Sequence, residues 1–185
     1  MKIVAEFDRH NDLALWGTAK VAQCSPQLRT VKILNDYTHM RSPGDFGDLE
    51  WLGYVGYKTY YLKFPCLQFV WYQTFLGVAA ITQLKDEPLD GFSLPLSNIY
   101  QKSGRICQPR SNNIEEAVGY FWQTIFNPYD NAWSGNKIVK DLGGYQGWEK
   151  SSRLDPNWVP DLSTDDEMRQ ITLGRFFFDV SMRGG

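Results

Sequence analysis

A cysteine stands where the sequence most readily presents a nucleophile to a substrate. Cys107 follows a glycine turn at Gly104 and a short extended piece, and it precedes a helix-like segment by several residues. Such a boundary can expose a side chain, and a cysteine attacks as the thiolate, which needs exposure and a favourable field. Arg105 and Arg110 flank it and would favour the thiolate. The alternative is a small buried side chain ending a strand, and spacing alone favours that alternative.

A polar loop before this cysteine carries the other candidate site residues. Asn98 supplies a side-chain amide, and in acyl transfer from a thioester such an amide stabilises the oxyanion of the tetrahedral intermediate. Ser97 stands beside it, and we group Ser97 with Arg105 and Arg110 as candidate binding residues. The chain has two histidines, and neither is close to Cys107 in sequence, so a Cys-His hydrolase is poorly supported.

Composition and charge limit the class of protein. The 185 residues fit one domain; 43% are hydrophobic, 22% charged and 15% aromatic, which favours a globular, sheet-rich fold. The net charge of -2 and the lack of a basic stripe argue against duplex nucleic acid as a partner. No apolar run has the length of a membrane span, and the N-terminus does not resemble a signal peptide. We therefore expect a cytoplasmic protein, or one assembled into a particle there.

Cysteine and histidine usage predicts neither disulfides nor metal. Three cysteines at wide spacing do not form a disulfide framework, and there is no CxxC pair. The two histidines have no second ligand pattern nearby, so a zinc site is not expected. No cofactor is expected either.

Periodicity predicts a sheet followed by a helix. Runs rich in β-branched and aromatic residues, expected as strands, cover residues 1–7, 28–34, 53–64, 66–72 and 75–84. The last three are closely spaced, which predicts an antiparallel meander. The stretch 35–48, between the predicted strands 28–34 and 53–64, is predicted to be a loop.

The sequence predicts a helix over residues 114–126. Apolar residues recur there with helical spacing, so the segment should pack one face on a sheet. Asn112 or Asn113 would cap it, with Glu115 and Glu116 at capping-box spacing.

The last third is expected to be mostly irregular. We predict loops and short turns from 129 to 160, anchored by Trp133, Trp148 and Trp158. A helix would begin near Thr164, followed by a last strand from Ile171 to Val180.

The stretch from Leu94 to Cys107 resembles the active-site region of the E2 ubiquitin-conjugating fold. In that fold a His-Pro-Asn loop precedes a Gly-x-Ile-Cys active site; here Leu96-Ser97-Asn98 precedes Gly104-Arg105-Ile106-Cys107. The preceding strands and the following aromatic helix are more similar to the prokaryotic E2-like proteins typified by PRTRC system protein B. The resemblance covers about residues 53–127.

The chain departs from that pattern in three ways. Leu96-Ser97 stands in place of His-Pro, the step from Asn98 to Cys107 is one residue longer, and Gln108-Pro109 follows the cysteine.

The resemblance implies a function and a set of partners. Cys107 would carry the C-terminus of a ubiquitin-like protein as a thioester and pass it to an amine, with Asn98 steadying the intermediate. The partners would be the ubiquitin-like protein and its adenylating enzyme. The implied fold is α+β: an antiparallel β-meander with a packed amphipathic helix.

We expect a single domain over residues 1–185, with a core at about 53–127 and extensions at 1–50 and 128–185.

One functional alternative is a non-catalytic phage or mobile-element protein that uses the same fold for assembly or protein binding. Another is a small-nucleotide pocket lined by Arg105, Arg110 and Trp122, for which the sequence has no phosphate loop.

Overall fold

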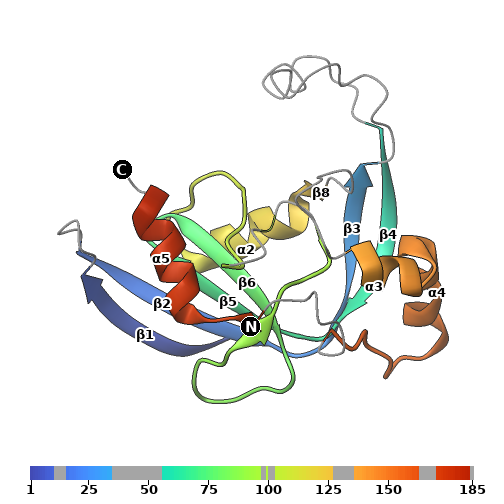
Figure 1. Ribbon diagram of the computed structural model, residues 1–185, viewed down its shortest axis with the longest axis horizontal. Helices are drawn as coiled ribbons and strands as arrows, with labels where there is room; N and C mark the ends of the chain where they lie inside the picture. Colours follow the sequence, from blue (N-terminus) through green and yellow to red (C-terminus); the bar gives the residue numbers. More distant parts are fainter. Residues whose placement is uncertain are drawn as a thin grey trace.

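The main sheet has six antiparallel strands. The computed structural model describes residues 1–10, 16–34, 56–96, 99, 103–126, 136–162 and 170–183. Within them the sheet takes the order β1-β2-β5-β6-β7-β9 (Figure 1). Its strands are β1 Lys2–His10, β2 Trp16–Cys24, β5 Cys66–Tyr72, β6 Phe75–Ile81, β7 Gly91–Phe92 and β9 Gln170–Ile171. The residues expected as an N-terminal extension thus supply two strands of the main sheet.

A second sheet of three strands lies beside the first. It has the order β4-β3-β8, from β4 Tyr57–Phe64, β3 Gln27–Leu34 and β8 Ile125–Phe126. The predicted three-stranded meander is therefore wrong in part, because β4 pairs with β3 and not with β5. Pro65 separates β4 from β5; it lacks a backbone N–H, which suits the point where the chain leaves one sheet for the other.

The hairpin of β5 and β6 confirms the rest of the meander. Tyr72 pairs with Phe75 across a two-residue turn, in which Gln73 adopts the left-handed conformation with φ of 59°. Positive φ in a two-residue turn matches the twist of antiparallel strands.

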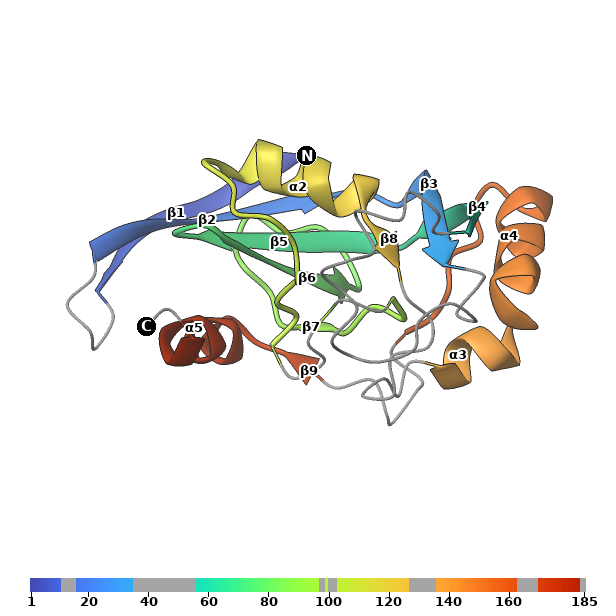
Figure 2. The same cartoon turned by 90° about the horizontal axis from the view of Figure 1, so that it is seen from above.

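Helices cover both faces of the main sheet. Figure 2 shows α2 (Ile114–Gln123) on one side and α5 (Leu173–Arg183) on the other. Successive strand residues point to opposite faces. Leu67 and Phe69 of β5 accordingly join the hydrophobic cluster beneath α2, while Val70 and Tyr72 join the cluster beneath α5.

The predicted helix and its cap are confirmed, with one change at its end. Asn113 is the N-cap: its side chain accepts a hydrogen bond of 2.8 Å from the Glu116 amide, and a Glu116 carboxylate oxygen accepts the Asn112 amide at 2.7 Å. The bond from the Asn112 amide, together with one from the Tyr120 hydroxyl, holds the pKa of Glu116 below its usual value. The helix ends at Gln123, and the next residues form β8 instead of a last helical turn.

The last third of the chain is more regular than expected. Residues predicted as loops form α3 (Asn136–Asp141) and α4 (Gly144–Leu154). Trp148 is fully buried within α4, and Trp158 packs partly buried against the same core.

The predicted strand from Ile171 to Val180 is wrong. Only Gln170–Ile171 is strand, as β9, and α5 begins at Leu173. The side chains that α5 packs against the sheet follow helical spacing, i, i+3, i+4 and i+7, and so form one face of a helix. They are Leu173, which is partly buried, and the buried Phe176, Phe177 and Val180.

Some predictions fall on residues outside the described ranges: the loop at 35–48, the start of the strand at 53–55, Trp133, and the helix start at Thr164. No helix formed by the described residues is long and apolar enough to cross a membrane.

Candidate functional site

A short extended segment before Cys107 is hydrogen-bonded to β6. The Val78 amide donates to the Gly104 carbonyl at 2.8 Å, and the Ile106 amide donates to the Leu76 carbonyl at 2.8 Å. Ile106 is buried beneath α2. Cys107 follows directly, and its side chain is exposed.

The backbone at position 104 requires a glycine. Its φ of 70° lies in the left-handed region that favours glycine, and an added Cβ would lie 2.5 Å from the Val78 carbonyl oxygen. The glycine turn inferred from the sequence thus lets the chain approach β6 closely, which fixes where the next three residues lie.

The chain beyond Cys107 is also fixed to the body of the protein. The Gln108 side-chain amide donates to the Ala117 carbonyl of α2 at 3.2 Å. Trp71 Nε1 donates to the hydroxyl of buried Ser111 at 3.0 Å. Because both neighbouring segments are hydrogen-bonded, the exposed thiol sits on a supported backbone.

Arg105 lies in the supporting structure beneath the cysteine. It is 7% exposed, and its Nε donates to Asp179 Oδ2 of α5 at 2.5 Å. Ser103 Oγ donates to the same oxygen at 3.2 Å, and the guanidinium lies over the Phe75 ring at 5.6 Å. This buried ion pair ties the segment before Cys107 to the C-terminal helix.

The other two cysteines differ from Cys107 in their environment. Cys24 is half-buried, and its sulfur accepts a hydrogen bond from the Gln27 side chain at 2.8 Å. Cys66 is buried. Desolvation by burial raises the pKa of both thiols, which disfavours their thiolate forms. Cys107 is the exposed one of the three.

Of the other expected site residues, Arg110, Ser97 and Asn98, the structure describes Arg110. Arg110 is exposed in the loop after Cys107. Ser97 and Asn98 lie outside the described residues, but the neighbouring Ile99 forms an antiparallel bridge with Ile106. Ile99 thus lies beside the segment that leads to Cys107.

The structure does not bring together the three residues of a nucleotide pocket. Trp122 packs against Phe64 and Phe69 in the cluster beneath α2. Arg105 bonds to Asp179 of α5, on the opposite face of the main sheet.

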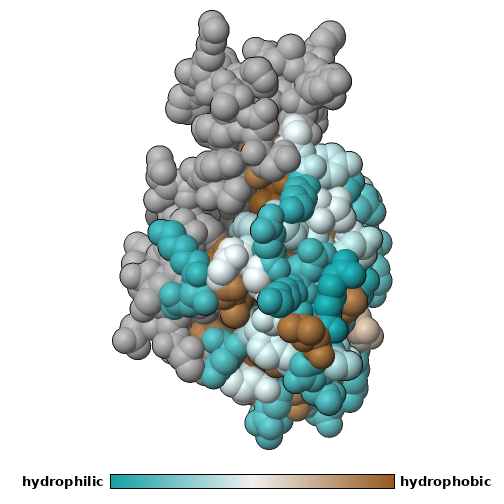
Figure 3. Space-filling model, turned by 90° about the vertical axis from the view of Figure 1, so that its right-hand side faces the viewer, coloured by the Kyte–Doolittle hydropathy of each residue, from teal (hydrophilic) through white to brown (hydrophobic). Residues whose placement is uncertain are grey.

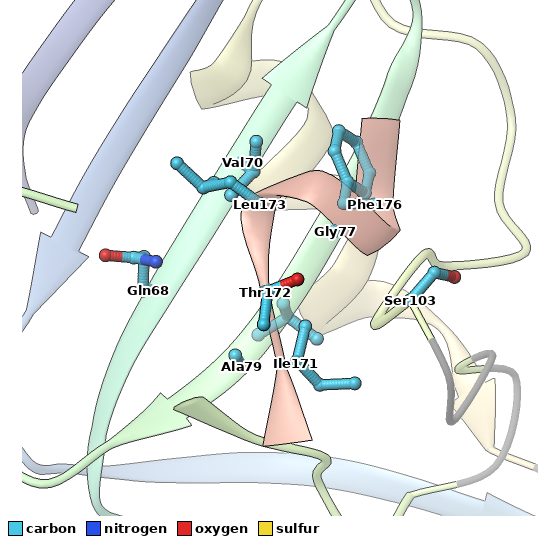
Figure 4. A pocket seen from close by; sticks show the side chains of 10 residues that line it. Gln68, Val70, Gly77, Ala79, Ser103, Ile171, Thr172, Leu173 and Phe176 are labelled. Carbon is cyan, nitrogen blue, oxygen red and sulfur yellow. The ribbon is translucent and has the colours of Figure 1, made fainter. Parts of the chain in front are cut away.

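A small cavity lies between the main sheet and α5. It has a volume of about 10 Å³, and its lining includes Ser103, Gly77 and Phe176 (Figure 4). That volume has room for about one water molecule and for no larger ligand. A more open hollow of about 280 Å³ lies near Lys2 and Asp86. Cys107 lines neither of them.

Metal binding finds no support in the part of the chain that the structure describes, because its His, Cys, Asp and Glu residues form no group of three able to hold an ion.

Sequence reasoning missed Asp179, which lies far beyond Cys107 in the chain. The available signal was an acidic residue on an apolar segment with helical spacing, and it was missed because that segment was predicted to be a strand.

Comparison of the chain with known proteins found no matching family model, no matching curated protein and no matching solved structure.

Proposed function

We propose that the protein accepts an acyl group as a thioester on Cys107 and transfers it to an amine, as an E2-like carrier of a ubiquitin-like protein. The observation that carries this proposal is the exposure of Cys107 at the end of a hydrogen-bonded, partly buried segment. Burial of this cysteine would have favoured the non-catalytic alternative.

The chemistry needs two steps. The Cys107 thiolate attacks the carbonyl of an incoming thioester, the donor's thiolate leaves, and a new thioester forms on Cys107. An amine then attacks that carbonyl, the amine loses a proton to solvent, and Cys107 leaves as thiolate. Each step passes through an oxyanion, and Asn98 is the expected donor to it.

Support for the site comes from its surroundings. Exposed Arg110 supplies a positive charge three residues after Cys107. The Ile99–Ile106 bridge holds Ile99, the residue that follows Asn98 in the sequence, beside the segment that leads to Cys107. Arg105 is already bonded to Asp179, so we assign Arg105 to support of the segment, and a direct binding role for it stays a prediction.

The first test is the reactivity of Cys107 in the folded protein. We expect iodoacetamide to modify Cys107 rapidly in the folded protein, because its side chain is exposed, when rates are followed by peptide mass spectrometry. Cys24 and Cys66 are internal controls and should react only on unfolding. A Cys107 that stays unmodified until the protein unfolds would leave a binding or assembly role as the better explanation.

The second test separates acyl transfer from simple thiol reactivity. The parent, Cys107→Ser and Asn98→Ala proteins are incubated with a short peptide thioester and then with free lysine. We expect an adduct on the parent that dithiothreitol removes and lysine discharges. Asn98→Ala should form and discharge it about 100-fold more slowly, the typical loss for one oxyanion donor. Equal rates in the parent and in Asn98→Ala would contradict a role for Asn98 as the hydrogen-bond donor to the oxyanion.

A further inference from the structure

One corner of the molecule carries a strong positive charge, although the chain as a whole is acidic. The segments β3, β4 and α4 contain six basic residues and one acidic residue, a net charge of +5. The whole chain has 19 basic and 21 acidic residues. The three elements are adjacent, because β3 pairs with β4 and α4 packs along β4.

Aromatic rings lie among these charges on one face of the small sheet. By strand alternation and register, Leu28 and Lys32 of β3 share a face with Tyr57, Tyr61 and Lys63 of β4. We call this the β3–β4 outer face. Tyr57 and Tyr61 are each 44% exposed and Leu28 is 52% exposed, so no helix covers it there.

Cations lie directly over both tyrosines. The Lys32 ammonium is 5.1 Å from the Tyr57 ring centroid, and the Arg153 guanidinium of α4 is 4.9 Å from that of Tyr61. Among the described residues, Lys32 and Lys63 of this face form no ion pair with a carboxylate, while Arg153 forms one with Glu149. The charge of the face is therefore largely uncompensated.

Helix α4 blocks the edge of β4 but leaves this face open. The Tyr61 amide donates to Glu149 at 3.0 Å and the Lys63 amide donates to Ser152 at 2.9 Å. Trp148 Nε1 donates to the Lys63 carbonyl at 3.0 Å. A partner strand cannot add to β4 where these side chains occupy its hydrogen-bonding groups, so a ligand would meet the side chains of the face.

We propose that the β3–β4 outer face binds single-stranded nucleic acid. Tyr57 and Tyr61 stack on bases, and Lys32 and Arg153 contact the phosphates. Stacking rings within a positive groove or face are the features that bind single strands without sequence preference. A duplex fits less well, because its bases already stack on one another.

An acidic protein surface is the weaker candidate for this face. Lysine is depleted at the centres of protein–protein interfaces, whereas this face has Lys32 and Lys63 beside its rings. Figure 3, viewed from the side of α3, α4 and β4, shows hydrophobic residues scattered among hydrophilic ones over the described part of this side.

The test is fluorescence anisotropy with labelled 12-nucleotide single-stranded DNA and RNA at 100 mM salt. We expect saturable binding to at least one of the two single strands, weaker competition by a duplex of the same length, and weaker competition by poly-glutamate. Tyr57→Ala and Tyr61→Ala should each weaken binding about fivefold or more. Lys32→Gln should lower the magnitude of the slope of log affinity against log salt by about 0.7.

Matched controls lie away from the face. Phe178→Ala removes an aromatic ring that is 68% exposed on α5, and Lys85→Gln removes an exposed lysine in the loop after β6; neither should change affinity. Tyr57→Leu and Tyr61→Leu keep most of the side-chain volume and should lose binding as the alanine variants do. Absence of saturable binding, poly-glutamate competition equal to that of the single strand, or unchanged affinity in the tyrosine variants would each overturn the proposal.

Discussion

Removal of Asp179 should destabilise the protein far more than removal of an exposed acid with the same pairing distance. In the Asp179→Ala variant, Arg105 Nε and Ser103 Oγ both lose the carboxylate oxygen to which they donate. The side chains of Arg105 and Asp179 are 9% and 21% exposed, so the pair is largely desolvated.

The magnitude follows from that burial. Removing one partner of a buried ion pair costs about 3–5 kcal/mol, because the other charge stays buried. Asp179 keeps some contact with water, so we expect the lower end, about 3 kcal/mol of the free energy of unfolding. For a chain of this size that corresponds to a melting temperature lower by about 6–12 °C.

A matched ion pair provides the control. Lys2 and Asp86 are also 2.5 Å apart, but their side chains are 71% and 89% exposed. Exposed pairs contribute little to stability, so Asp86→Ala should leave the unfolding midpoint nearly unchanged. Replacing the buried pair with Arg105→Met and Asp179→Leu should restore much of the stability lost in Asp179→Ala, since no charge stays buried.

The assay is urea unfolding followed by tryptophan fluorescence, with ΔG from linear extrapolation. A loss below about 1 kcal/mol in Asp179→Ala, or equal losses in Asp179→Ala and Asp86→Ala, would refute the view that this pair fastens α5 to the segment before Cys107.

Two further predictions concern packing and pH. Gly77→Ala should destabilise by about 1–3 kcal/mol in the same urea assay, because its Cβ would lie 2.6 Å from the Phe176 ring, while Gly119→Ala, with nothing within 4 Å, should not destabilise. Burial, with a smaller contribution from Tyr60, raises the pKa of Tyr145 above its usual value. The folded state therefore keeps this phenol protonated when the unfolded chain ionises it near pH 10, and stability should fall as the pH rises above about 10. Tyr145→Phe should reduce that fall and cost little at pH 7, since no described group bonds to the buried hydroxyl; an unchanged fall in ΔG between pH 9 and 11 would contradict this.

Local signals were enough to predict α2 and the β5–β6 hairpin. The α2 cap uses residues three positions apart, Asn113 and Glu116, and its apolar face repeats every three to four residues. The hairpin needs only two apolar runs and a two-residue turn. In each case the residues that determine the structure are neighbours in sequence, so the local sequence pattern is enough to predict the element.

Long-range contacts determined the elements that were missed. Helix α4 has few apolar side chains, and it packs against the distant strand β4. Ser152 and Glu149 look like surface residues, yet both accept amide hydrogens from β4. In α5 three consecutive phenylalanines resemble a strand, and only the spacing of the buried ones shows the helix.

The exposure of Cys107 depends on register, which the sequence could not supply. Ile106 and Cys107 are both apolar enough for the core, and a slip of one residue along β6 would exchange the sides to which they point. The bond from the Ile106 amide to the Leu76 carbonyl selects the register that buries Ile106. Gly104 permits the close approach to β6, and Asp179 holds Arg105 from the other face. The same contacts that stabilise α5 therefore decide whether the thiol faces solvent, so a variant that loosens α5 should change Cys107 reactivity as well as stability.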